Sequence, residues 1–287
     1  MNKALSVIIP SKEINSDLKN CIFSVINSVI KAEKEKETEI IVATHKKNAS
    51  REKLIPKNSC LRIIYGGGDY PLNPSQARNI GIKKAEGKIL AFIDADCIAE
   101  ENWVSQIFEG FKKIKNNPSV DCIQGDYWTH LSKNEDLWSK LYSEYRKRHA
   151  LEHIRKYQNY FITERLDGRN FAIQAALAKK FLFNEDLKKG QDREFGQRLT
   201  KHGYKIMFVN EMLVYHNPLS LKEIISKEFN YGTWAIKWRE IKFWKVVKWQ
   251  WFKGEISLGL LLITLISRSS YELGKLYGYL RNKFNKL

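Results

Sequence analysis

Four short apolar runs, separated by segments of helical periodicity, constrain the fold of this chain more than any other feature. The runs are Leu5–Pro10, Glu39–Ala43, Leu61–Tyr65 and Lys88–Ile93. Between them, Leu18–Ile30 places apolar residues at helical spacing, and Pro74–Glu86 predicts a second helix that ends at Gly87. Strands that alternate with helices predict a mostly parallel sheet with helices on both faces. Ligands of such sheets bind beyond the C-terminal ends of the strands, so the site is expected there.

The second half of the chain has a different character. Residues 126–165 are rich in aromatic and basic side chains, and we expect helices laid over the sheet there. A helix is predicted over Gln191–Gly203, because a glycine ends its apolar pattern. Short strands are predicted over Lys205–Val209 and Met212–Tyr215.

The length of 287 residues suits one large α/β domain with an appendage. We expect a catalytic domain over residues 1–218. Its nucleotide-binding half would span about residues 1–125 and its acceptor half about residues 126–218. Residues 219–287 are expected to form a helical, basic appendage.

The net charge of +17 favours anionic partners such as nucleic acid, acidic lipid or a phosphorylated small molecule. A lysine-rich, well-solvated surface explains the same charge, so charge alone does not identify the partner. The basic residues match no nucleic-acid recognition module, and nucleic acid is not expected. The four cysteines contain no CxxC spacing, which argues against a zinc site. The start of the chain lacks a signal-peptide pattern, which predicts a cytosolic protein with reduced thiols.

Two carboxylates, Asp94 and Asp96, directly follow the apolar run that ends at Ile93. Such a pair at a strand end is unfavourable unless something neutralises it. A divalent cation does so, and the same cation can bridge to a diphosphate. Turns are rich in Asp, so a plain turn is the alternative. The position at a strand end favours metal or nucleotide binding.

Five segments, in the right order, resemble the core of the family 2 glycosyltransferases. They are Ser6–Ser11, Ser75–Gly87, Ile93–Asp96, Gly168–Ile173 and Gly190–Gly196, and the match continues through Val214–His216. The resemblance covers roughly residues 4–218. It implies a GT-A fold, which is a Rossmann-like, mostly parallel α/β sheet with flanking helices. It also implies metal-dependent transfer of a sugar from a nucleotide-sugar to a hydroxyl acceptor, with inversion.

The resemblance implies a role for each matching residue. Asp96 would ligate Mn²⁺ or Mg²⁺, His216 would complete the metal shell, and Asp94 would share the metal or contact the donor ribose. Asp192 would be the base that takes the proton from the acceptor hydroxyl. Arg78 would lie near the donor diphosphate. The other donor contacts are expected at Pro10, Ser11, Glu13, Thr44 and Asn79, and the acceptor contacts at Gly168, Arg169, Asn170, Gln191 and Trp128.

Each of these roles has a structural alternative. Arg78 is also explained as a surface charge on a helix, and Asp192 as an acid that favours the first turn of a helix. A single histidine such as His216 is often structural.

The chain departs from the family pattern at two places. Gln191 stands where the family has Glu, next to the expected base. Ala43–Lys46 replaces the acidic pair that commonly lies near the nucleotide base, and Glu13 is the candidate substitute. Uridine is the family's commonest base, so a UDP-linked donor is expected.

Three other functions share features with this sequence. A nucleotidyltransferase needs a glycine-rich loop after the first strand, and Pro10–Glu13 is not one. A phosphatase of the haloacid type carries its carboxylate pair near the N-terminus, followed by Thr or Val, whereas Cys97 and Ile98 follow here. A catalytically inactive nucleotide-sugar-binding relative stays open.

Residues 219–287 predict docking on a membrane surface. They hold five of the eight tryptophans and thirteen basic residues against five acids, a net charge of +8. Tryptophan prefers the membrane interface, and Lys and Arg prefer anionic headgroups. The longest uncharged run, Ile256–Ser267, would extend about 18 Å as a helix, short of the ~30 Å hydrocarbon core. Docking would place the protein on the inner face of the cell membrane, with a lipid-linked acceptor. A helical hairpin packed on the catalytic domain is the alternative.

Overall fold

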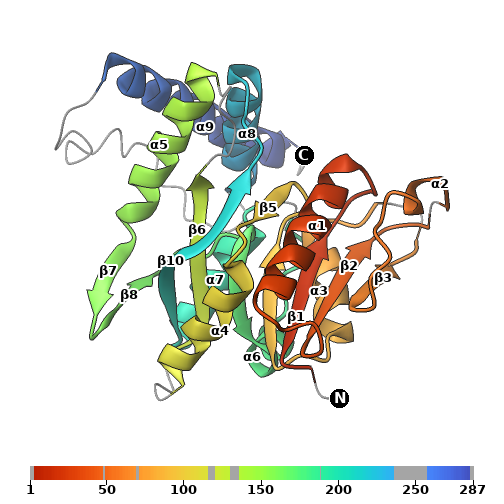
Figure 1. Cartoon of the computed structure of the whole chain (residues 1–287). Helices are drawn as coiled ribbons and strands as arrows, with labels where there is room; N and C mark the ends of the chain where they lie inside the picture. Colours follow the sequence, from red (N-terminus) through yellow and green to blue (C-terminus); the bar gives the residue numbers. More distant parts are fainter. Residues whose placement is uncertain are drawn as a thin grey trace. The chain divides into compact units, whose positions relative to one another are not determined.

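A computed structural model describes residues 3–47, 49–68, 71–115, 120–129, 136–187, 189–235 and 257–284. The chain divides into two compact units. The first contains residues 1–129, 153–186 and 191–216, and the second contains residues 130–152, 187–190 and 217–287. Figure 1 shows the sheet of the first unit and the helices of the second.

Half of the sheet in the first unit is parallel, as the sequence predicts. It contains β1 (Leu5–Pro10), β2 (Thr38–Thr44), β3 (Leu61–Tyr65) and β4 (Ile89–Ile93). Their order is β3-β2-β1-β4, and every neighbouring pair in this block is parallel. The apolar side chains of β1 and β2 are completely buried, which explains why these strands are continuous apolar runs. All four strands end at one edge of the sheet.

The other half of the sheet is mixed. The order continues from β4 through β9 (Asn170–Gln174), β6 (Val120–Thr129), β10 (Lys205–His216), β8 (Tyr160–Thr163) and β7 (Ile154–Tyr157). β9 runs antiparallel to both of its neighbours, whereas β10 is parallel to β6. The short strand β5 (Cys97–Ala99) pairs with the end of β10.

Two predicted elements differ from the structure in this half. The region expected to be entirely helical contains the β7–β8 hairpin, whose strands extend the sheet. The two short strands predicted after Gly203 are one strand, β10, interrupted by register shifts between Val209 and Tyr215. The exposed pair Asn210 and Glu211 lies at this irregularity and breaks the apolar alternation that a strand shows.

Helices cover both faces of the sheet in the first unit (Figure 1). α1 (Ser16–Lys31) and α4 (Trp103–Ile114) pack together on one face. α3 (Pro74–Lys84), α6 (Ala175–Phe181) and α7 (Gln191–Lys201) share one apolar cluster on the other face. The remaining helix, α2, is the single turn Ala49–Glu52.

Side-chain caps fix the starts of two of these helices. Asn15 accepts a hydrogen bond from the Leu18 N–H at the start of α1. At α3, Asn73 and Gln76 form a reciprocal capping box with Pro74 inside the first turn. Such caps satisfy N–H groups that have no partner within the helix.

The second unit contains three described helices, α5 (Leu137–Leu151), α8 (Leu221–Ala235) and α9 (Leu258–Phe284). α8 and α9 pack so closely that a Cβ at Gly232 would collide with the Tyr271 carbonyl oxygen, and one at Gly274 with that of Phe229. The predicted helical C-terminal appendage is therefore present, although residues 236–256, with four of its tryptophans, lie outside the described part of the chain.

α5 joins the second unit through a buried polar contact. The Tyr142 hydroxyl donates a hydrogen bond of 2.6 Å to Glu228 of α8, and Arg146 lies 3.5 Å from the same carboxylate. Burial and the neighbouring carboxylate raise the pKa of Tyr142 well above its ordinary value, so the hydroxyl remains a donor. None of the described helices combines the length and hydropathy needed to cross a bilayer.

Candidate active site

The turn after β4 brings Asp96 to His216. After Asp94 and Asp96 the chain enters β5, where Cys97 pairs with His216 at the end of β10. This register places His216 Nε2 3.2 Å from Asp96 Oδ2. The Asp96 side chain is 49% exposed, so it stays open to a ligand from solution. Two residues from distant segments thus converge where the sequence predicts a metal.

Asp94 faces inward and pairs with Arg78. Arg78 of α3 is only 3% exposed, and its Nη2 donates to Asp94 Oδ1 at 2.7 Å. The guanidinium also lies over the Phe183 ring, 5.4 Å from its centroid. Burial raises the pKa of Asp94, the Arg78 charge opposes the rise, and the carboxylates of Asp96 and Asp167 add to it. A buried guanidinium is unfavourable without a partner, so this ion pair holds both side chains in place.

Gly168 connects Arg78 to Asp192. Its carbonyl oxygen accepts from Arg78 Nη2 at 3.4 Å, and its N–H donates to Asp192 Oδ2 at 3.0 Å. A Cβ at position 168 would lie 2.6 Å from Arg78 Nη2, so only glycine allows this approach. Asp192 stands in the first turn of α7, as the sequence predicts. Hydrogen bonds therefore link Asp94 to Asp192 through the Arg78 side chain and the backbone of Gly168.

The loop that carries Gly168 is anchored at both ends. Asp167 accepts two hydrogen bonds from the Arg169 guanidinium, at 2.7 and 2.8 Å, and its own N–H donates to Gln124 at 2.7 Å. Asn170 is completely buried and donates to the carbonyl oxygens of Asp126 and Met212 at 2.6 Å each.

Sequence reasoning missed Asp167. The sequence feature that could have revealed it is its position, directly before Gly168 of the Gly168–Ile173 segment and two residues before Arg169. Because its charge acts on Asp94, it belongs to the same electrostatic group.

Two residues that the sequence predicts to contact substrate form hydrogen bonds within the protein instead. Asn79, expected at the donor, exchanges hydrogen bonds with the Phe183 main chain at 2.8 and 2.9 Å and is only 2% exposed. Asn170, expected at the acceptor, also accepts from the Trp103 indole at 2.8 Å, so its amide is fully occupied. The amide groups of both side chains bond to the protein itself, which favours structural roles for Asn79 and Asn170.

The other predicted residues lie at the expected strand and helix ends. Pro10 ends β1, and Thr44 ends β2 as a buried residue. The Ser11 hydroxyl donates to the Glu13 carbonyl at 2.6 Å, while the Glu13 carboxylate forms an ion pair with Arg51. Gln191 opens α7 and is buried. Trp128 belongs to β6, but its side chain lies outside the described part of the structure.

The side chains of Asp96 and His216 suit a divalent ion that takes its other ligands from the substrate. Among the described residues, no three His, Cys, Asp or Glu side chains come together closely enough to hold a metal by themselves. Asp96 and His216 form a half-open pair, and Mn²⁺ or Mg²⁺ commonly takes its remaining ligands from substrate phosphates and water.

Two buried cysteines, Cys21 and Cys97, lie next to this pair. Cys21 donates from Sγ to the Asp94 carbonyl at 3.4 Å, and Cys97 lies in β5. Burial raises the pKa of both thiols well above the ordinary value, and the carboxylates of Asp96 and Asp94 add to the rise. Without a bound metal, both thiols are therefore protonated at neutral pH.

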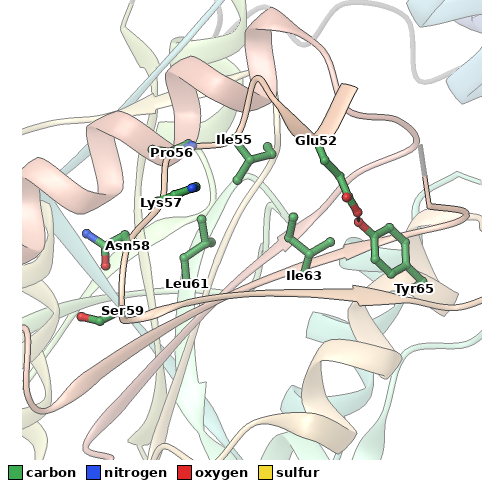
Figure 2. A pocket seen from close by; sticks show the side chains of 9 residues that line it. All are labelled: Glu52, Ile55, Pro56, Lys57, Asn58, Ser59, Leu61, Ile63 and Tyr65. Atoms are coloured by element: carbon green, nitrogen blue, oxygen red, sulfur yellow. Dashed lines mark hydrogen bonds between the residues drawn. The ribbon is translucent and has the colours of Figure 1, made fainter. Parts of the chain in front are cut away.

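A separate pocket of about 680 Å³ lies on the edge strand β3 and the segment after α2 (Figure 2). Leu61, Ile63 and Ile55 give it an apolar wall, and Tyr65 at one end donates a hydrogen bond to Glu52. Burial, helped by Glu52, raises the pKa of Tyr65 to about 12. None of the candidate site residues lines this pocket, so we assign it no part in the chemistry.

Solved structures define the class of this fold. The mannosyltransferase PcManGT from Pyrobaculum calidifontis, solved with GDP-Man and Mn²⁺, has a TM-score of 0.59 at 11% identity and covers 96% of this chain and 74% of its own. TarS 1-349 of S. aureus with UDP-GlcNAc has a TM-score of 0.52 at 15% identity, covering 83% of this chain and 68% of its own. The chain spans only 40% of a longer TarS structure. The fold is the GT-A fold of glycosyltransferases.

Sequence comparison then gives the family. Residues 6–179, more than half of the chain, match the model of glycosyl transferase family 2. A glycosyltransferase of Methanocaldococcus jannaschii, MJ1057, itself uncharacterized, is 26% identical over 223 residues, which are 72% of this chain and 73% of the relative. The chain belongs to glycosyl transferase family 2, and the resemblance seen in its motifs is confirmed.

Proposed function

We propose that this glycosyltransferase moves a sugar from a UDP-linked donor to a hydroxyl acceptor with inversion, in polysaccharide or glycoconjugate synthesis. One observation supports the proposal above all others. The hydrogen bonds from Asp94 through Arg78 and Gly168 to Asp192 bring the carboxylates expected at the donor and at the acceptor into one connected group. A sugar transfer needs these two functions side by side, because the acceptor oxygen attacks the carbon that the diphosphate leaves.

Donor binding would take place at the carboxyl edge of the parallel strands. Asp96 and His216 would hold Mn²⁺ or Mg²⁺, while Asp94 would orient the donor ribose from its ion pair with Arg78. When bound, the metal would neutralise charge on the departing diphosphate. Pro10, Ser11 and Thr44 would contact the nucleoside. One solved structure of this fold holds UDP-GlcNAc and another holds GDP-Man with Mn²⁺, which supports a nucleotide-sugar donor bound with a metal.

Asp192 would accept the proton of the acceptor hydroxyl during attack. The Gly168 N–H fixes Oδ2, and the Arg193 N–H donates to Oδ1 at 2.8 Å, so both oxygens have defined positions. With a positioned carboxylate as base, the acceptor oxygen would displace the diphosphate in a single step, without a covalent intermediate on the enzyme. Gly168, Arg169, Gln191 and Trp128 would line the acceptor side, with Arg169 held by its two bonds to Asp167.

Inversion has a direct test that requires no known acceptor, because water can take the acceptor's place. With Mn²⁺ and an α-linked donor such as UDP-GlcNAc, we expect slow hydrolysis that releases the β-anomer first. Proton NMR of the earliest product, recorded before the free sugar equilibrates, distinguishes the anomers. Initial release of the α-anomer would contradict inversion, and absence of hydrolysis across a panel of UDP- and GDP-sugars would favour the inactive binding relative.

We assign Arg78 a positioning role in place of the predicted contact with diphosphate. Its Nε and Nη1 atoms are buried and have no hydrogen-bond partner in the described part of the chain, while Nη2 serves both Asp94 and Gly168. A lysine keeps the positive charge but lacks the planar guanidinium group with its several N–H donors. We expect Arg78→Lys to lower kcat by about ten- to a hundredfold, as small displacements at a reacting centre do.

A double-mutant cycle separates this role from general damage. If Arg78 acts through Asp192, Arg78→Lys should add little to the kcat loss of Asp192→Asn. Arg62→Lys is the matched control, since Arg62 pairs with the buried Glu39 away from the site and should leave kcat unchanged. The same fold-loss from Arg78→Lys in both backgrounds would show that Arg78 does not act through Asp192.

The cytosolic, membrane-surface location and the lipid-linked acceptor expected from the sequence remain part of this proposal. Their support is the charge and tryptophan content of residues 219–287. A membrane-bound enzyme would meet a lipid-linked acceptor at the surface where that acceptor lies.

A further inference from the structure

One side of α9 carries leucine at almost every turn. The row consists of Leu258, Leu262, Leu265, Leu273, Leu276 and Leu280, and each of these side chains is between 41% and 81% exposed. Successive members are three, four or eight residues apart, and Ser269 fills the longest interval. This spacing keeps all six on one side of a helix. We name this row the leucine face.

The opposite side of α9 carries small and polar residues. Thr264, Ser267, Ser270, Gly274 and Gly278 are buried there, after Leu260 and Ile263 at the start of the helix, and α9 passes close to α8 at Gly274. A helix in a protein surrounded by water normally buries its leucines and exposes its polar residues. After Ile263, α9 does the reverse. Small residues between helices, with large apolar side chains facing outward, are the arrangement that lipid surroundings favour.

The charges on α9 favour lipid over a second copy of this chain. The described helix carries Arg268, Lys275, Arg281 and Lys283, whereas Glu272 is its single acid and pairs with Lys275 at 2.7 Å. Residues 219–287 carry a net charge of +8, so two copies joined through this part of the chain would repel each other. Anionic headgroups would instead attract this net positive charge.

The sequence on the N-terminal side of α9 agrees with a lipid partner. Residues 236–256 contain Trp238, Trp244, Trp249 and Trp251 together with six basic residues. Tryptophan concentrates at the level of the headgroups, and basic residues bind anionic lipid there. No structure is assigned to this segment, so this support comes from its composition.

We propose that the leucine face of α9 docks into the interfacial region of an anionic phospholipid membrane. The leucines enter the boundary between headgroups and acyl chains, while the small-residue side stays packed on α8. This inference goes beyond sugar transfer, rests on the membrane-surface location proposed above, and names the surface that would make the contact.

Vesicle sedimentation of the full chain tests the proposal. Vesicles of phosphatidylcholine alone are compared with vesicles that contain about one third phosphatidylglycerol, at low salt. The test variant combines Leu265→Gln, Leu273→Gln and Leu276→Gln. Its matched control combines Phe23→Gln, Ile30→Gln and Leu54→Gln, which replace similarly exposed apolar residues of the first unit. Circular dichroism and donor hydrolysis verify that both variants remain folded and active.

We expect the wild-type chain and the control variant to sediment with the anionic vesicles. The leucine-face variant should bind at least about tenfold more weakly, because three apolar side chains no longer leave water. Equal binding by the leucine-face variant, or no binding by the wild type, would overturn the proposal. A dimer in solution that the leucine-face variant dissociates, without vesicle binding, would assign the face to a second copy. These outcomes do not depend on glycosyl transfer, so they leave the proposed activity separately testable.

Discussion

Asp192→Asn should lower kcat by about two to four orders of magnitude and leave donor affinity nearly constant. Asparagine keeps the shape of the side chain, and its amide oxygen can still accept from the Gly168 N–H. It cannot take the proton of the attacking hydroxyl. The effect should therefore appear in turnover alone. Steady-state hydrolysis of the donor measures kcat, and calorimetric titration with UDP and Mn²⁺ measures affinity.

Glu194→Gln is the control for this change, since Glu194 lies in the same first turn of α7 and pairs with Arg198 instead of Gly168. It should keep nearly the wild-type kcat. Near wild-type turnover of Asp192→Asn would show that another group takes the proton.

Asp96→Ala should remove the part of UDP binding that depends on Mn²⁺. Asp96 is the more exposed carboxylate of the pair, and its partner His216 cannot hold the ion alone. Loss of even an outer-shell partner of a metal ligand weakens metal binding by about ten- to a hundredfold, so loss of the ligand itself should cost at least that much.

Thermal denaturation with and without UDP and Mn²⁺ gives the readout. In the wild type, ligand at a hundred times its Kd stabilises the folded state by about 2.7 kcal/mol, and this gain should disappear in Asp96→Ala. Asp121→Ala is the control, because Asp121 lies at the start of β6 and contacts Gln174. An unchanged Mn²⁺-dependent rise in melting temperature for Asp96→Ala would exclude Asp96 as the chief ligand.

The sequence predicts the parallel half of the fold well because burial is uniform there. β1 and β2 lie inside the sheet, so no polar face interrupts their apolar runs. The β7–β8 hairpin escapes prediction for the opposite reason. Arg155 and Lys156 are exposed on the outermost strand, and its four residues show no apolar pattern.

The sequence predicts the individual residues of the candidate site, but it does not predict which of their side chains bond to one another. Asp94, Asp96, Asp192 and His216 each stand at an element end that motifs reveal. That Arg78 is buried against Asp94 depends on the packing of α3 beside β1, and that Asn170 is fully occupied depends on strands far apart in the chain. Such contacts join residues that are far apart in the chain, so local sequence patterns cannot predict them.

The loop at Gly168 is anchored by the protein itself, so the orientation of the Gly168 N–H is set during folding and not during substrate binding. Asp167 is bonded to Gln124 on one side of Gly168, and Asn170, two residues after it, is bonded to β6, β10 and Trp103. The Gly168 N–H therefore has a fixed direction before any substrate arrives. If Asp192 is the base, as we propose, the entropy of orienting it is lost once, when the chain folds, and not again in each catalytic cycle.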